Sequence, residues 1–105
     1  MDEFDRLAAA FADRPGVTIG EGRGFGSGTL QAGGRIFAMR NAAGLALKVP
    51  AARVTALLAA GDGLPFDAGK GRPMKEWVVI PWRSDAEWLA LAEEALAFVG
   101  ATRKP

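Results

Sequence analysis

Three cations and one tryptophan lie within eight residues, namely Lys70, Arg72, Lys75 and Trp77. Lysine and arginine side chains contact phosphates, and an aromatic ring stacks on a nucleobase. The alternative is that Trp77 packs in the core while the cations are solvated on a loop. By strand alternation Trp77 and Val79 share one face, and the other face is apolar as well, which favours a strand buried on both sides.

A second candidate for binding chemistry is the glycine-rich stretch from Gly20 to Gly28, which carries Arg23 and Phe25. Loops that combine arginine with an aromatic residue are common in recognition, although Phe25 could equally pack back on the core. Neither this stretch nor Gly63–Gly71 has the glycine spacing of a dinucleotide or P-loop phosphate site. We therefore predict a loop here and no bound nucleotide cofactor.

The chain contains no cysteine, no histidine and no tyrosine. Disulfides, zinc sites of the Cys/His kind and Ser-His-Asp triads therefore cannot form. A catalyst would have to be a carboxylate or a lysine with a strongly shifted pKa. The loop carboxylates Asp62 and Asp67 show no pattern of that kind, so we predict a protein that is not an enzyme and binds no metal or other cofactor.

The formal net charge of +1 conceals a basic middle between acidic ends. Residues 22–83 hold nine basic and three acidic residues, while residues 1–21 and 84–105 carry net charges of −3 and −2. Acidic helices could pack beside a basic sheet and neutralise it, or the middle could attract an anionic partner. In the second case the phosphate contacts would come from seven cations: Arg23, Arg35, Arg40, Lys48, Lys70, Arg72 and Lys75.

Apolar periodicity and turn residues predict three helices and several short strands. Gly33-Gly34 predicts a tight hairpin turn, because both glycines can adopt positive φ. Ser84 and Glu87 form a capping-box pattern, and Gly100 is expected to end the last helix, leaving about 101–105 as a frayed tail. The predicted helices cover 2–13, 50–60 and 84–99, and the predicted strands cover 17–19, 28–32, 35–39, 45–49 and 75–80.

The length of the turn after the third strand decides which side chains face the core. A four-residue turn would place Lys48 opposite Phe37 in the core, so we favour a five-residue turn with Leu47 opposite Phe37 and Leu45 opposite Met39. The predicted core face is then Leu30, Phe37, Met39, Leu45, Leu47 and Val49. The second face includes Gln31, Ile36 and Ala38, and it is a candidate surface for a homodimer.

These elements predict one α+β domain over residues 1–105, with helices against one face of an antiparallel sheet of four or five strands. The expected order is α-β-β-β-α-β(-β)-α. No apolar run is long enough for a membrane span, and the acidic N-terminus is unlike a signal peptide. We therefore expect a cytoplasmic protein that does not interact with membranes.

Several stretches follow one another between about Pro15 and Phe98: Gly34–Ala38, Leu45–Val49, the second helix, Gly63–Phe66, Met74–Trp77 and the helix Trp88–Val99. Their order resembles the N-terminal domain of TfoX (Sxy) competence regulators and the related YjbR/MmcQ proteins. The resemblance implies a bacterial protein with a fold similar to secretion chaperones, and a family often labelled DNA-binding. It favours a non-enzymatic module that binds DNA or another polyanion; the alternative is a protein-interaction or homodimerisation module.

Overall fold

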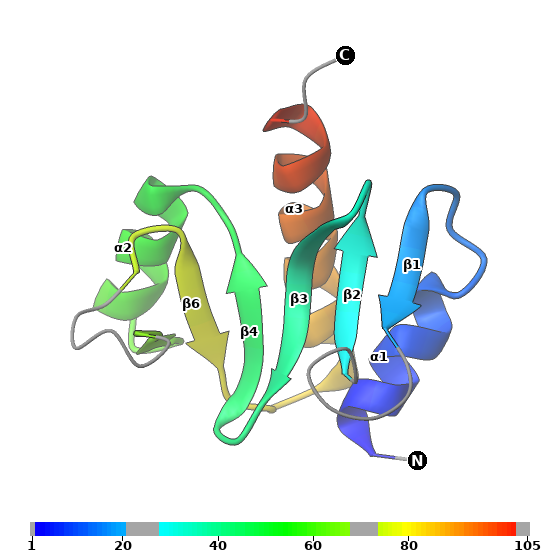
Figure 1. Cartoon of the computed structure of the whole chain (residues 1–105). Coiled ribbons are helices and arrows are strands. Elements are labelled where there is room, and N and C mark those ends of the chain that lie inside the picture. Colours follow the sequence, from blue (N-terminus) through cyan, green and yellow to red (C-terminus); the bar gives the residue numbers. More distant parts are fainter. Residues whose placement is uncertain (1, 21–27, 68–73, 103–105) are drawn as a thin grey trace.

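The computed structural model describes residues 2–20, 28–67 and 74–102, which form three helices and one antiparallel sheet of six strands. The strands are arranged in the order β1-β2-β3-β4-β6-β5 (Figure 1). The α+β class, the three helices and the single antiparallel sheet are confirmed. The elements are α1 (Glu3–Phe11), β1 (Val17–Gly20), β2 (Thr29–Ala32), β3 (Arg35–Asn41), β4 (Gly44–Lys48), α2 (Ala51–Ala59), β5 (Leu64–Pro65), β6 (Trp77–Ile80) and α3 (Asp85–Thr102).

The prediction of four or five strands was wrong. Four strands precede α2, one more than the predicted order has, since β1 joins the sheet and pairs along its whole length with β2. The two-residue strand β5 adds an edge beside β6. The sequence predicts a strand at 17–19 and allows an extra short strand near Pro65-Phe66, but the predicted total leaves one of the two out.

Each helix begins where a local signal places it. The Asp2 carboxylate accepts a hydrogen bond from Asp5 N at 2.9 Å, which satisfies a free donor in the first turn of α1. Pro50 precedes α2, and Ser84 Oγ accepts from Glu87 N at 3.1 Å at the start of α3. The end predicted at Gly100 was wrong, because α3 continues through Gly100 to Thr102.

All three helices lie on one face of the sheet (Figure 1). The last helix, α3, packs across β2, β3 and β4; α1 packs beside α3; and α2 packs against β6. The core lies between these helices and the sheet, and its largest fully buried side chains include Phe11 and Phe37, whose rings meet edge to face at 5.7 Å. The opposite face of the sheet is covered by none of the described helices.

A β-bulge at Phe37 decides which face the following residues occupy. Gln31 pairs with Ile36, whereas Leu30 pairs with Ala38 and not with Phe37 as the hairpin pattern suggests. Phe37 is therefore an extra residue in β3. As a result both Phe37 and Ala38 are fully buried in the core, which corrects the assignment of Ala38 to the second face.

The turn between β3 and β4 is also shorter than predicted. It contains only Ala42 and Ala43, and Asn41 Oδ1 accepts a hydrogen bond from Ala43 N at 2.8 Å. Leu47 therefore lies opposite Ala38, and Leu45 lies opposite Arg40. The core face is correct for Leu30, Phe37, Leu45, Leu47 and Val49, and wrong for Met39, which is partly exposed and pairs with buried Thr29 and Ala46.

None of the described helices combines the length and the apolar character that a membrane crossing requires.

Candidate functional site

Two of the predicted cations and Trp77, one of the two residues predicted to stack on a base (the other is Phe25), come together at one end of the sheet. Lys48 at the end of β4, Lys75 just before β6, and Trp77 at the start of β6 line a single cavity of about 330 Å³. The remaining lining residues are Ala51, Met74 and Glu76. We call this space the Lys48–Trp77 cavity.

Strand pairing places these side chains together. Lys48 lies directly opposite Trp77 in the β4–β6 pair, and Val49 N donates to Glu76 O at 3.1 Å to continue the ladder. Met74 N donates to Phe66 O at 2.8 Å, which holds the segment before β6 against the chain that follows β5. The cavity is thus fixed by backbone bonds between segments distant in sequence.

The charges around Lys48 are loosely balanced. Its Nζ atom lies 3.4 Å from Glu76 Oε1 and 5.8 Å from the centre of the Trp77 ring. The Trp77 ring also packs against the Phe66 ring, with ring centres 5.6 Å apart. Lys75 is exposed, and within the described residues it makes no ion pair. The cavity therefore contains two ammonium groups and one carboxylate.

The amino end of α2 adds a partial positive charge at Ala51. Pro50 provides no side-chain cap for this helix, and the first turn holds no acidic residue. Backbone N–H groups at a helix start carry about half a positive charge and attract anions. The helix start therefore acts in the same direction as Lys48 and Lys75.

The other predicted contacts are separate from this cavity. Arg40 lies at the far end of β3, where it pairs with Asp2 and, at 3.3 Å, with Asp5. The hydrogen bond from the backbone N–H of Asp5, and to a smaller extent the one from Arg40, lowers the pKa of Asp2. Arg35 is exposed beside the Gly33-Gly34 turn and does not line the cavity. Four of the predicted contacts lie outside the described residues: Arg23, Phe25, Lys70 and Arg72.

Helix carboxylates hold several further arginines. Arg53 Nε lies 2.8 Å from Glu94, and Arg83 Nη2 lies 2.7 Å from Glu87. Together with Arg40, these pairs show that acidic helices neutralise much of the basic middle segment. In the described part of the chain the predicted cations therefore do not form one continuous surface.

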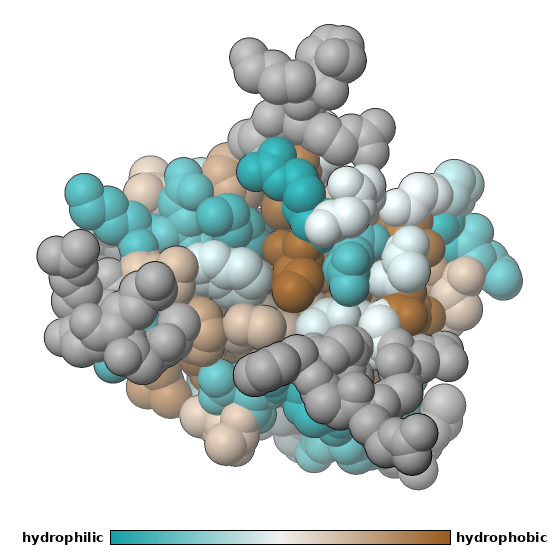
Figure 2. Space-filling model, in the orientation of Figure 1, coloured by the Kyte–Doolittle hydropathy of each residue, from teal (hydrophilic) through white to brown (hydrophobic). Residues whose placement is uncertain are grey.

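Two of the three residues of the predicted dimer face lie on the uncovered face of the sheet. Gln31 and Ile36 lie on the uncovered face and are partly exposed, whereas Ala38 belongs to the core. Met39 and Leu64, which is 44% exposed, are additional apolar residues of this face that the sequence pattern did not identify. Figure 2 shows this side of the molecule, where apolar side chains are interspersed with polar ones.

Two lining residues, Ala51 and Met74, could not be found from residue type, because neither carries binding chemistry. The proline before α2 was the one available signal, since it implies a helix start without a capping side chain. Among the described residues, no three carboxylates lie close enough together to hold a metal ion.

Comparison of the chain with protein family models, with curated proteins and with solved structures finds no match. The resemblance to the TfoX and YjbR/MmcQ proteins, and to secretion chaperones, therefore stays a prediction.

Proposed function

We propose that the chain is a non-enzymatic binding module that takes a phosphate-bearing ligand, such as a nucleic acid strand, in the Lys48–Trp77 cavity. The supporting observation is the convergence of two lysines and an aromatic ring at the uncapped start of α2. A phosphate would contact the ammonium groups and the helix start, and a base would stack on Trp77.

The ion pair within the cavity does not block an anion. Lys48 and Glu76 are 3.4 Å apart, and their side chains are 27% and 45% exposed. Pairs of this kind contribute about 0–1 kcal/mol, so a phosphate can replace Glu76 as the partner of Lys48 at little cost. The ligand then gains the attraction of Lys75, which has no competing partner among the described residues.

A single strand fits this cavity better than a duplex. A helix that reads the major groove presents several polar or basic side chains to the base edges. The only cation of α2 is Arg53, and its guanidinium already binds Glu94. One aromatic ring with two cations matches instead the stacking and backbone contacts of a single-stranded ligand.

Fluorescence anisotropy with a short labelled single strand, at about 50 and 200 mM salt, tests this function. Two phosphate contacts predict a slope of about −1.4 for log affinity against log salt concentration. Lys48→Met and Lys75→Gln should each make the slope shallower by about 0.7, to about −0.7. Trp77→Leu should weaken binding by about 1–3 kcal/mol, the usual contribution of one stacked base.

Arg35→Gln is the matched control, because it removes a cation at the same end of the sheet that does not line the cavity. It should leave the slope unchanged. Circular dichroism of each variant confirms that the fold is retained. The proposal is wrong if the wild-type curve is flat at low salt and micromolar protein, or if Arg35→Gln costs as much as Lys48→Met.

A second candidate function is self-association through the uncovered face of the sheet. Ile36, Met39 and Leu64 are accessible there, and no described helix shields them. Exposed apolar groups on a sheet face often serve as contact surfaces between proteins.

A further inference from the structure

We propose a second binding site at the opposite end of the sheet, for a ligand that carries a guanidinium or ammonium group on an apolar arm. The site is a cavity of about 350 Å³, which we call the Trp82 cavity. It is independent of the anion site proposed above and takes a ligand of the opposite charge. The lining residues are Asp2, Glu3, Phe4, Arg40, Asn41, Ala42, Ala43, Gly44, Trp82 and Trp88.

Three segments form the walls of this cavity: the start of α1, the β3–β4 turn, and the connection from β6 to α3. Gly44 brings the last two together. A Cβ atom at this position would lie 2.2 Å from the carbonyl oxygen of Ile80 and 2.8 Å from Pro81 Cα, so only glycine permits the approach. The turn and Trp82 therefore border the same space.

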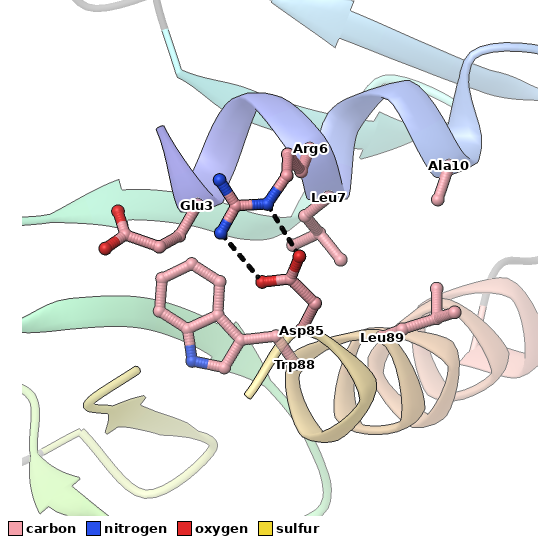
Figure 3. Close-up of a pocket in the computed structure, with 7 residues that line it drawn as sticks. All are labelled: Glu3, Arg6, Leu7, Ala10, Asp85, Trp88 and Leu89. Atoms are coloured by element: carbon pink, nitrogen blue, oxygen red, sulfur yellow. Dashed lines mark hydrogen bonds and ion pairs between the residues drawn. The ribbon is translucent and has the colours of Figure 1, made fainter. Parts of the chain in front are cut away.

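Trp82 offers a fixed aromatic surface. Trp82 is 44% exposed to solvent. Its ring is nevertheless held in place, because the indole N–H donates a hydrogen bond to Asp85 Oδ1 at 2.9 Å. Asp85 is held in turn by Arg6, through Nε–Oδ2 and Nη2–Oδ1 contacts of 2.6 and 3.1 Å (Figure 3). Because the polar atom of the ring is already bonded, its remaining exposed surface is available for contact with a ligand.

The charges around this ring favour a cation. Four carboxylates lie in or next to the cavity, against the two guanidinium groups of Arg40 and Arg6 and the α-amino group, whose charge also acts on Asp2; one negative charge is left in excess. Arg40 pairs with two of the carboxylates and lies over the Phe4 ring at 4.8 Å; Arg6 pairs with a third. The four carboxylates are Asp2, Glu3, Asp5 and Asp85.

The fourth carboxylate, Glu3, is available to a ligand. Within the described residues it makes no ion pair or hydrogen bond, and Figure 3 shows its side chain extending away from the Arg6–Asp85 pair. Tryptophan is the aromatic residue that attracts cations best. A guanidinium or ammonium group can thus contact the indole of Trp82 while donating to Glu3, as the side chain of arginine or a polyamine would.

Nuclear magnetic resonance titration of the full chain at low ionic strength tests this inference. The probes are the N-acetylated and C-amidated peptide Gly-Arg-Gly, the same capped peptide with neutral citrulline in place of arginine, and spermidine. The indole N–H signal of Trp82 should shift with the arginine peptide or with spermidine, while the signal of Trp77 stays in place. Trp→Phe variants assign the three indole signals. Binding of the peptide alone would identify a protein ligand, and binding of spermidine alone would identify a free polyamine.

Two variants separate the site from a general effect of charge. Glu3→Gln and Trp82→Leu should each weaken binding by about threefold or more. Glu94→Gln makes the same change in net charge at a carboxylate that pairs with Arg53 and does not line the cavity, so it should leave binding unchanged. Equal binding of the citrulline peptide, equal loss in Glu94→Gln, or no shift of Trp82 with either cation would overturn the proposal.

Discussion

Arg6 and Asp85 lie 79 residues apart in the chain and form a two-point ion pair, with Nε–Oδ2 and Nη2–Oδ1 distances of 2.6 and 3.1 Å. Arg14 and Glu93 repeat this arrangement at the same separation, with Nη1–Oε1 at 2.8 Å. Arg14 follows Arg6 by eight positions in the sequence, and Glu93 follows Asp85 by the same number. The first and last helices therefore run side by side in the same direction, as Figure 1 shows.

The Arg6–Asp85 pair predicts a specific loss of stability in acid. The Arg6 guanidinium, followed by the Trp82 indole N–H, lowers the pKa of Asp85 from 3.8 to about 2. As the pH falls, the Asp85 carboxylate is therefore protonated in the unfolded chain before it is protonated in the folded protein. The contribution of Asp85 to stability is thus complete above about pH 4 and decreases between about pH 4 and 2. Urea denaturation of wild type and Asp85→Asn should show a difference at pH 7 that closes towards pH 2.

Asp13→Asn is the control for this measurement, because Asp13 is exposed and makes no ion pair within the described residues. It should follow the wild-type dependence on pH throughout. A difference between Asp85→Asn and wild type that stays constant from pH 7 to pH 2 would contradict the ionic role of Asp85.

Gly44→Ala should destabilise the protein severely. The added Cβ would meet the backbone of Ile80 at 2.2 Å, where no flexible side chain can move aside, and φ at this position is +153°. Backbone strain and overpacking together predict a loss of about 2–5 kcal/mol in the free energy of unfolding. Gly61→Ala, also at positive φ but with nothing within 4 Å of the new Cβ, should cost only about 1 kcal/mol. Equal losses in urea denaturation would show that the close approach is unimportant.

Gly100→Ala should stabilise the protein. Gly100 lies inside α3, and a Cβ atom built there meets nothing within 4 Å. Alanine in a helix interior is favoured over glycine by about 1 kcal/mol, and less near a helix end. The thermal midpoint should therefore rise by a few degrees. A lower midpoint would mean that α3 ends before this residue in solution.

Ile36→Glu tests self-association. If the uncovered face joins two copies, sedimentation of the wild type should show a dimer that increases with concentration, and a carboxylate at position 36 should abolish it. Ala56→Glu, on an exposed side of α2, should have no effect. A wild-type protein that stays monomeric at high micromolar concentration would exclude this function, while leaving the anion site to be tested separately.

Local signals in the sequence were sufficient for several elements of the fold. The apolar face of α1, formed by Phe4, Leu7 and Phe11, is buried as its spacing predicts. Gly33 and Gly34 adopt φ values of +60° and +82° in the predicted hairpin turn. In these cases the residues that determine the structure are close together in the chain.

The side-chain orientation in β3 could not be predicted, because two irregularities act together. The bulge at Phe37 resets the alternation, and the short turn after Asn41 shifts the pairing of β4. A rule based on a regular strand buries Met39 and exposes Ala38, whereas the structure does the opposite. A bulge of this kind leaves no clear mark in a single sequence.

The candidate site was predictable in its residue types but not in its grouping. Lys48 and Trp77 are neighbours only because β6 pairs with β4, and Arg40 is neutralised only because α1 begins beside the end of β3. Both relationships join segments separated by tens of residues. The charge pattern alone therefore left open whether the cations were available to a ligand.

The side-by-side arrangement of the first and last helices has a consequence for synthesis on the ribosome. Phe4, Leu7 and Phe11 are made about 80 residues before the segment that begins at Asp85 and lies against them. At about 5–20 residues per second, the part of this apolar face that α3 covers stays exposed for roughly 4 to 16 seconds, whereas Phe37, which meets Phe11, is made earlier. Over that interval the growing polypeptide can aggregate through its exposed apolar side chains. A chaperone that binds α1 would protect these side chains until α3 has been synthesised.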